Sequence, residues 1–369
     1  MRTEKIANRQ LLLIVYMIRS TVIIATLPVL TSADALQDAW VAAIITYAGT
    51  VVIINIIAGL GVRYPQQTLV EFAHRLLGKW PGKAVAMLVL WSFLHLVSVD
   101  IRIYGEMILS EFLTETPLVF VISTMVLLSA YAAYMGVEVI GRLADLFFPV
   151  FVLMVVASLL ATTGAWRPEN LQPVLARGLG PPLRASVTPI AVSAELMVLA
   201  ILIPSLTQPR EALKTSLVAI TLASLTLVLV AAVVVATLGA EAGARSVFPF
   251  LRMIRSVGIT EFLERVEAFA TLAWGLGLFI TVSTFMFCGA RGIAQVFGVQ
   301  DYRPLVLPMA VPWVVLSIHS FEDMFQLRTF FQPRIFGPYG LALILVPYGL
   351  LWAGHAFQGL LHPEKRKRL

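Results

Sequence analysis

The chain has 369 residues, of which 59% are hydrophobic and only 13% are charged, and its mean hydropathy is +0.88. Soluble domains are about 45 to 50% apolar and about 25% charged, so this composition excludes a water-soluble enzyme, a nucleic-acid-binding protein and a disordered chain. A crossing of the hydrocarbon core takes about 20 apolar residues, and the chain has enough for about ten. The net charge of +6 is typical of a membrane protein with basic cytoplasmic loops.

Cysteine and histidine are too sparse for a disulfide or a metal centre. The single cysteine, Cys288, has no partner within the chain. The five histidines are scattered, and none lies three or four residues from another, the spacing that pairs ligands on one helix. We therefore predict neither a metal site nor a cofactor.

Ten long, nearly uncharged runs predict ten transmembrane helices in one domain, residues 1–369. The runs cover residues 10–31, 40–61, 84–109, 118–135, 145–163, 187–204, 216–238, 268–290, 305–320 and 338–360. The first run is too long for the apolar region of a signal peptide, so we expect it to remain in the mature protein. The predicted fold class is an all-α polytopic membrane protein.

The distribution of Lys and Arg predicts the orientation. Segments on the side of the N-terminus contain 16 Lys and Arg residues, including the tail Lys365–Arg368, whereas segments on the other side contain 9. Because basic residues accumulate in cytoplasmic loops, both termini are predicted to be cytoplasmic.

The first span contains a buried charge. Arg19 lies about nine residues into this span, roughly 14 Å from its start and close to the bilayer midplane. Two hydroxyl residues, Ser20 and Thr21, follow it directly. An ionisable side chain at this depth is costly, so it is a candidate for function.

The third span predicts a second polar position. Its uncharged run is short of the hydrocarbon thickness, so the helix has to continue through Asp100, Arg102, Tyr104 and Glu106. Arg102 and Glu106 are four residues apart and can form an ion pair. The pair is either purely structural or also part of a functional site. Asp100 and Tyr104 share another face of the helix and are better candidates for a pocket.

The sixth span has a polar centre between two prolines. Glu195 lies near its middle, close to Ser193, and Pro189 and Pro204 bracket both residues. Such interrupted spans are typical of discontinuous helices, whose freed backbone groups hold ligands near the midplane. Because Arg19 and Glu195 occupy spans five apart, the chain is predicted to consist of two inverted five-helix repeats.

Two long connections lie on the predicted outer side. Residues 164–186 contain several prolines and are predicted to form a cap over the outer mouth. Residues 239–267 are predicted to form a short interfacial or re-entrant helix before the eighth span, and an amphipathic surface turn is the alternative.

Motifs along the whole chain resemble the spore germination B-subunit family. The motifs are Arg63–Glu71 (RYPQQTLVE), Leu77-Gly78-Lys79, Thr116-Pro117, Gly136–Arg142 (GVEVIGR), Phe148-Pro149, Val247–Phe250 with Arg252, and Glu261–Arg265 (EFLER) before Trp274. No single motif is specific, but their order and spacing together are typical of that family. The family is similar to the amino acid, polyamine and organocation transporter superfamily.

The resemblance implies both a fold and a set of partners. It implies a ten-helix, 5+5 inverted-repeat transporter-like fold with discontinuous helices 1 and 6, in the spore inner membrane or cell membrane. The implied partners are a germinant receptor A subunit, a C lipoprotein subunit, the lipid bilayer and a small germinant, with an amino acid expected, and no nucleic acid. The implied ligand-binding residues are Arg19, Ser20, Thr21, Asp100, Tyr104, Ser193 and Glu195.

This sequence departs from the superfamily at two places. The first span has no glycine where relatives commonly break the helix, and the fifth has no lysine, which some proton-coupled relatives use. Hydroxyl residues of the eighth span are possible sodium ligands, although such side chains more often bond their own backbone. Motifs of proteases, hydrolases and nucleotide-binding enzymes are absent, so no enzymatic activity is predicted.

Two functions remain open from the sequence. In the first, a zwitterionic germinant places its carboxylate near Arg19 and its ammonium near Glu195, and binding is signalled to partner subunits. In the second, the chain is a stand-alone amino acid permease. For either function, Arg19 and Glu195 can instead pair only with each other.

Overall fold

The computed structural model describes residues 4–256 and 261–361, with side chains except at 22–33, 261–269 and 361. The basic tail Lys365–Arg368 lies outside the described residues, and the EFLER motif (261–265) lies in a range whose side chains are not described. The helices are α1 (Asn8–Ala35), α2 (Ala39–Gly61), α3 (Leu69–Leu77), α4 (Lys79–Glu111), α5 (Leu118–Met135), α6 (Val137–Ala161), α7 (Gly180–Ala191), α8 (Leu199–Leu202), α9 (Ala212–Leu238), α10 (Ala240–Arg245), α11 (Pro249–Arg255), α12 (Glu261–Phe297), α13 (Arg303–His319), α14 (Met324–Phe330) and α15 (Pro333–Leu361).

The long helices coincide with the apolar runs of the sequence. Among the described residues, eight helical segments are long and apolar enough to cross a membrane, and the pair α13 and α14, bent by 100°, makes a ninth candidate. Helix α1 is a further helix of 28 residues, whose side chains are described only in part. The all-α membrane class predicted from composition is therefore confirmed.

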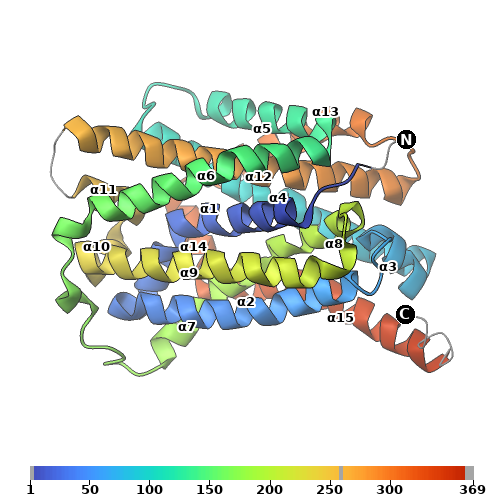
Figure 1. The fold of residues 1–369 in the computed structure, drawn as a ribbon, viewed down its shortest axis with the longest axis horizontal. Helices are drawn as coiled ribbons and strands as arrows, with labels where there is room; N and C mark the ends of the chain where they lie inside the picture. Colours follow the sequence, from blue (N-terminus) through green and yellow to red (C-terminus); the bar gives the residue numbers. More distant parts are fainter. Residues whose placement is uncertain (1–3, 257–260, 362–369) are drawn as a thin grey trace.

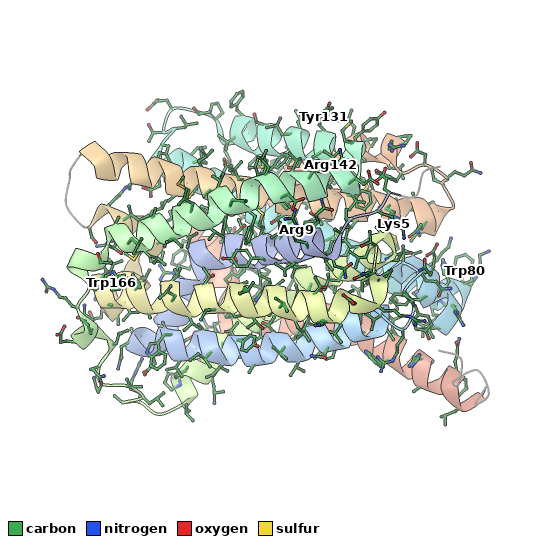
Figure 2. The ribbon with its side chains drawn as sticks, in the orientation of Figure 1. Lys5, Arg9, Trp80, Tyr131, Arg142 and Trp166 are labelled. Carbon is green, nitrogen blue, oxygen red and sulfur yellow. The ribbon has the colours of Figure 1, made fainter. Side chains whose placement is uncertain are left out.

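The helices form one bundle with two distinct ends. Figure 1 shows that α1 begins and α15 ends at the same end of the bundle, here called the terminal end. Helices α10 and α11 lie at the other end, here called the opposite end. Trp80 lies at the terminal end and Trp166 at the opposite end (Figure 2), as expected for aromatic side chains near the two membrane interfaces.

The sixth span is interrupted, and the structure begins it earlier than the sequence predicted. Gly180–Ser205, here called the broken segment, starts as α7, narrows to a 3₁₀ helix over Val192–Val198 and ends in α8 and a second 3₁₀ turn. Pro189 lacks an N–H group and cannot complete the α-helical ladder there. A stretch of 3₁₀ helix within a span often marks a functional position.

The first span is not interrupted, so the predicted discontinuity of helix 1 is wrong. Helix α1 continues from Asn8 to Ala35. Its sequence contains no glycine, the residue that most readily leaves helical geometry, and this explains why the backbone does not unwind. Of the two spans predicted to be broken, only the sixth is.

The broken segment lies at the centre of the bundle. In its most apolar 18-residue window, 89% of the residues are buried. In the corresponding window of Val137–Ala165, 28% are buried. Helix α7 packs against α1, α2 and α15. A segment that is surrounded by protein can keep irregular backbone at membrane depth, because lipid does not contact it.

The two outer connections differ from each other. Residues 164–186 bond the end of α9, from the backbone N–H of Arg167 to the carbonyl of Ala236 (3.0 Å), and the residue before α2, from the N–H of Leu175 to Asp38 Oδ1 (2.9 Å). Their last residues already belong to α7, which begins at Gly180, and the cap over the outer mouth stays a prediction. The second connection contains α11, whose Phe250, Leu251 and Met253 are buried, so the predicted short helix is confirmed there, and whether it is interfacial or re-entrant stays a prediction.

Candidate binding site

Three ionisable side chains meet inside the bundle. Arg19 of α1, Asp100 of α4 and Glu195 of the broken segment are 3%, 4% and 2% exposed, and we call them the charged cluster. Glu195 is close enough to both Arg19 and Asp100 for its charge to act on theirs. The structure thus brings together three residues that lie far apart in the sequence.

The guanidinium of Arg19 is held by the broken segment. Its Nη2 donates to the backbone carbonyl of Pro189 at 3.4 Å, one of the carbonyls near the transition to 3₁₀ helix. No ion pair joins Arg19 to Glu195, although both side chains are described. A purely structural pair between these two residues, the alternative left open by the sequence, is therefore not formed as a direct contact.

Several buried polar atoms around the cluster have no partner among the described residues. They are Arg19 Nη1, Ser20 Oγ and Asp100 Oδ2, and Ser283 Oγ of α12 is a fourth. Buried polar groups in proteins are almost always hydrogen-bonded, so each exception requires an explanation. Arg19 and Ser20 supply donors and Asp100 supplies an acceptor, the kinds of group that a small polar ligand needs.

Two predicted hydroxyl residues use their hydrogen bonds within the protein. Thr21 Oγ1 donates to the carbonyl of Met17 at 2.6 Å. Ser193 Oγ lies 3.0 Å from Thr50 Oγ1 of α2, so Thr50 positions the start of the 3₁₀ stretch. Sequence reasoning missed Thr50, since it lies in an unremarkable apolar span and only its distance in the fold reveals it.

The hydroxyl residues of the eighth span follow the common pattern for membrane helices. Thr281 and Thr284 donate to the carbonyls one turn earlier, at 3.0 and 2.7 Å. These two side chains are therefore occupied by their own helix. Only Ser283 between them is left without a partner.

Tyr104 lies apart from the charged cluster. Its ring packs edge-on against Trp274 of α12, with centroids 6.2 Å apart. Trp274 also lines a small apolar cavity of about 30 Å³ with Thr21, Phe151 and Phe248. A pocket shared by Asp100 and Tyr104 stays a prediction.

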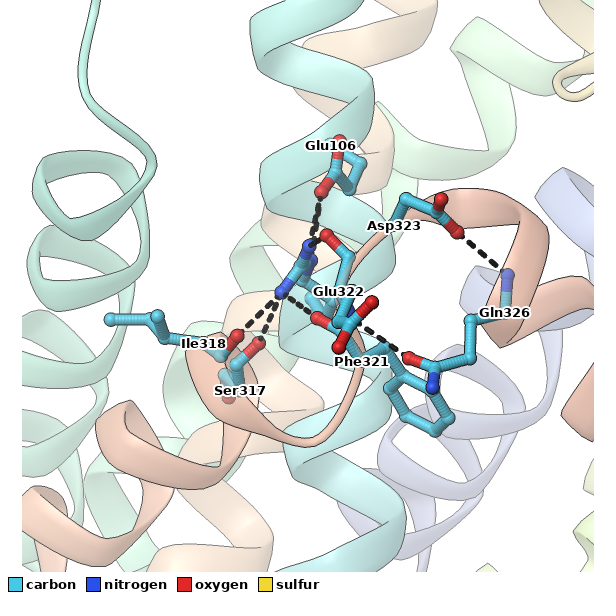
Figure 3. Close-up of polar contacts among 8 residues, drawn as sticks. Glu106, Ser317, Ile318, Phe321, Glu322, Asp323 and Gln326 are labelled. Atoms are coloured by element: carbon cyan, nitrogen blue, oxygen red, sulfur yellow. Dashed lines mark hydrogen bonds and ion pairs between the residues drawn. The ribbon is translucent and has the colours of Figure 1, made fainter.

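Arg102 has a structural position at the bend between α13 and α14 (Figure 3). Its Nη1 donates to the carbonyls of Ile318 (2.7 Å) and Phe321 (2.8 Å), and its Nη2 donates to that of Glu322 (3.2 Å). The Nε bonds Glu106 Oε1 at 2.8 Å. Arg102 thereby satisfies carbonyls that the end of α13 leaves free, and its structural interpretation is confirmed.

The terminal end of the broken segment is closed by residues Glu4–Gln10, here called the N-terminal clasp. The N–H of Ile6 donates to the carbonyl of Ser205 at 2.8 Å, and the N–H of Thr207 donates to the carbonyl of Ile6 at 3.0 Å. Lys5 Nζ adds a bond to the carbonyl of Pro204 at 3.0 Å. Backbone pairing of this kind joins the start of the chain to the end of the sixth span.

Comparisons with known proteins identify both the family and the fold. Residues 5–324 match the spore germination protein family (Spore_permease). The chain is 27% identical over 324 residues to spore germination protein KB of Bacillus subtilis, covering 86% of each chain, and 27% identical over 299 residues to spore germination protein YndE of the same organism, covering 80% and 82%.

Solved transporters share the fold at low sequence identity. MhsT in complex with L-phenylalanine superposes with a TM-score of 0.63 and 14% identity, covering 93% of this chain and 89% of that one. Mhp1, a nucleobase-cation-symport-1 family transporter, superposes with a TM-score of 0.68 and 12% identity, covering 93% and 78%. The chain thus has a transporter-like membrane fold and belongs to the spore germination B-subunit family, whose members are non-enzymatic membrane proteins.

Proposed function

We propose that this chain is the B subunit of a spore germinant receptor and binds a small zwitterionic germinant, such as an amino acid, at the charged cluster. The observation that supports this most is the set of buried polar atoms without partners, on Arg19, Ser20 and Asp100. Together they offer donors to a carboxylate and an acceptor to an ammonium group.

The charge of the cluster fits such a ligand. It contains two carboxyl groups, of Asp100 and Glu195, and one guanidinium, of Arg19, all buried. The second carboxyl group needs a proton or a cation to balance it, and the ammonium of an amino acid supplies one. The ligand carboxylate then faces Arg19 Nη1 and the hydroxyl of Ser20. Exclusion of water strengthens these contacts.

The proposed architecture has ten spans arranged as two inverted five-helix repeats in one domain. Helix α1 is the first span, the broken segment is the sixth, and α13 with α14 counts as the ninth. The excess of Lys and Arg at the terminal end supports a cytoplasmic location of both termini in the spore inner membrane or cell membrane.

The proposed partners are a receptor A subunit and a C lipoprotein subunit. Family membership supports this assignment. Ligand bound at the cluster contacts α1, α4 and the broken segment at once, so it favours whichever arrangement of these elements closes around it. The partner subunits then detect the change in population and start germination.

A binding measurement tests the proposal. Purified protein in nanodiscs is titrated with a panel of amino acids, sugars and nucleosides. For the amino acid that binds, Glu195→Gln and Arg19→Gln are each expected to lower affinity about ten- to hundredfold, the value of one charge-assisted hydrogen bond. Arg142→Gln, an exposed position whose side chain is 77% accessible, is the matched control and should leave binding unchanged. Unchanged affinity in folded Glu195→Gln protein would remove Glu195 from the site.

A stand-alone amino acid permease is the alternative, favoured by the similarity to solved transporters. The same cluster would bind its substrate, so binding does not separate the two functions. Uptake of the identified amino acid into vesicles that contain only this chain does. A receptor subunit should take up no more than empty vesicles, whereas a permease should accumulate it.

A further inference from the structure

A large cavity opens at the opposite end of the bundle, where α7, α14 and α15 begin or meet. Its volume is about 770 Å³, within the range of small-molecule sites. Three arginines line it from three elements: Arg184 of α7, Arg328 of α14 and Arg334 of α15. Asp34 is the single acidic residue among those that line it. The cavity, here called the arginine cavity, is therefore strongly basic.

The guanidinium groups in this cavity are largely available to a ligand. Arg184 is exposed and has no hydrogen bond or ion pair with any residue that the structure describes. Among the described residues, Arg334 bonds only the side chain of Gln332, through Nε at 2.9 Å. Arg328 donates to the backbone carbonyl of Ala244 and so also has a structural role. Asp34 offsets one of the three positive charges of the cavity, but no ion pair joins it to these arginines within the described part of the chain.

Helix α7 contributes residues to both the arginine cavity and the contacts of the charged cluster. Val187 lines the cavity, and Thr188 Oγ1 donates to the carbonyl of Phe331 at 2.9 Å, which fixes the cavity wall to α7. Pro189, whose carbonyl accepts from Arg19, follows two residues after Val187, about 3 Å further along the helix axis. The cavity and the contact of Arg19 are thus at similar depths along α7, on different faces of the helix.

We propose that the arginine cavity is an anion-accepting vestibule that binds ligands carrying a carboxylate or phosphate group. A guanidinium group can donate two parallel hydrogen bonds to two oxygens of a carboxylate or a phosphate, and a concave basic surface raises the local concentration of such anions. The vestibule would also be the entrance to the charged cluster, and this part of the proposal rests on the proposed function. Anion binding by the cavity is independent of it.

The test compares two amino acids of equal shape that differ in one charge. L-Glutamate and L-glutamine are titrated into purified full-length protein at about 20 mM and about 500 mM KCl. Wild-type protein is expected to bind glutamate about tenfold more tightly at low salt, and the preference should shrink at high salt. The double variant Arg184→Gln/Arg334→Gln should lose the preference. The double variant Arg142→Gln/Arg210→Gln removes the same charge from exposed positions at the terminal end and should retain it.

Two further measurements separate the possible sources of the preference. The preference should survive Arg19→Gln, because it arises outside the charged cluster; its loss there would assign the preference to Arg19 and overturn the vestibule. In a second measurement, the protein is purified from nanodiscs that contain phosphatidylglycerol, and lipid that stays bound to it is identified by mass spectrometry. Phosphatidylglycerol held by the wild type and released by Arg184→Gln/Arg334→Gln assigns the cavity to lipid headgroups, and glutamate preference without bound lipid assigns it to soluble anions. Wild-type protein that shows neither would refute the proposal.

Discussion

The two ends of the broken segment are held in different ways. At the terminal end, Ile6 pairs through its backbone with Ser205 and Thr207. At the opposite end, α7 begins beside the arginine cavity of about 770 Å³. One end of this span is thus tied to the start of the chain by backbone hydrogen bonds, while the other end borders a cavity. The proposed vestibule lies at the end that the clasp does not hold.

The two ends also use arginine differently. Arg102, near the opposite end, is buried and satisfies backbone carbonyls at the bend after α13. Arg9, in the clasp, is 76% exposed and pairs with Asp145 at 2.8 Å. A buried arginine that bonds several carbonyls is hard to replace, whereas an exposed pair contributes little. Substitutions of Arg102, of Arg9 and of residues that contact the clasp test this difference between the two ends.

The largest effect is expected for Arg102→Met. The substitution leaves the carbonyls of Ile318, Phe321 and Glu322 without their donor and Glu106 without its partner. The carbonyl of Phe321 is buried and those of Ile318 and Glu322 are partly buried, and a buried polar group without a partner costs about 1 to 3 kcal/mol, so the total loss should be about 3 kcal/mol. Thermal unfolding of purified protein in detergent measures it, with Arg142→Met as the exposed control. A melting temperature equal to that of the control would show that the bend between α13 and α14 does not depend on Arg102.

An intermediate effect is expected for Gly136→Ala, at the terminal end. Gly136 has φ of 100°, which a residue with a side chain rarely adopts, and an added Cβ would lie 2.3 Å from Glu4 Oε2. Strain of this kind costs about 1 to 3 kcal/mol, and Glu4 would also have to leave its bond to the N–H of Val137.

Gly164→Ala is the matched control for this substitution, because nothing lies within 4 Å of its added Cβ and its backbone needs no glycine. Hydrogen exchange at Ile6 and Thr207 locates the effect. Faster exchange in Gly136→Ala at these amides, with no change around α14, would tie Gly136 to the clasp. Equal protection in both glycine variants would contradict that link.

The sequence predicted the spans well because a membrane helix is defined by length and apolarity, which are both local. The predicted runs 84–109 and 118–135, for example, correspond to α4 and α5. The interruption of the sixth span was also predictable, since Pro189 and the polar residues Ser193 and Glu195 mark it. The prediction of a break in the first span was based on the superfamily pattern. The absence of glycine from this span already argued against a break.

The hydrogen bonds around the site join residues that are far apart in the sequence, so no local sequence pattern predicts them. The spacing of Arg102 and Glu106 predicted their pair, but the carbonyls that Arg102 also binds lie more than 200 residues further along the chain. Thr50 is a similar case, because its partner Ser193 is 143 residues away. Backbone carbonyls have no sequence signature at all. Such contacts become visible only when the helices are packed together.

The smallest effect is expected for Arg9→Gln. The pair with Asp145 is short, at 2.8 Å, but Arg9 is 76% exposed, and Asp145 keeps a second donor in Gln10 Nε2, also at 2.8 Å. Exposed pairs contribute about 0 to 1 kcal/mol because water and salt screen them, so melting should shift by less than for Gly136→Ala.

The matched variant for Arg9→Gln is Ile6→Ala, which removes a fully buried side chain of the same clasp. Truncation of a buried isoleucine to alanine costs about 2 to 5 kcal/mol of stability, so Ile6→Ala should destabilise the protein more than Arg9→Gln does. If Arg9→Gln were the more damaging of the two, surface charge would hold the clasp in place of backbone pairing and apolar burial. The terminal end would then be sensitive to salt, and its contrast with the arginine cavity at the opposite end would weaken, because both would respond to ionic strength.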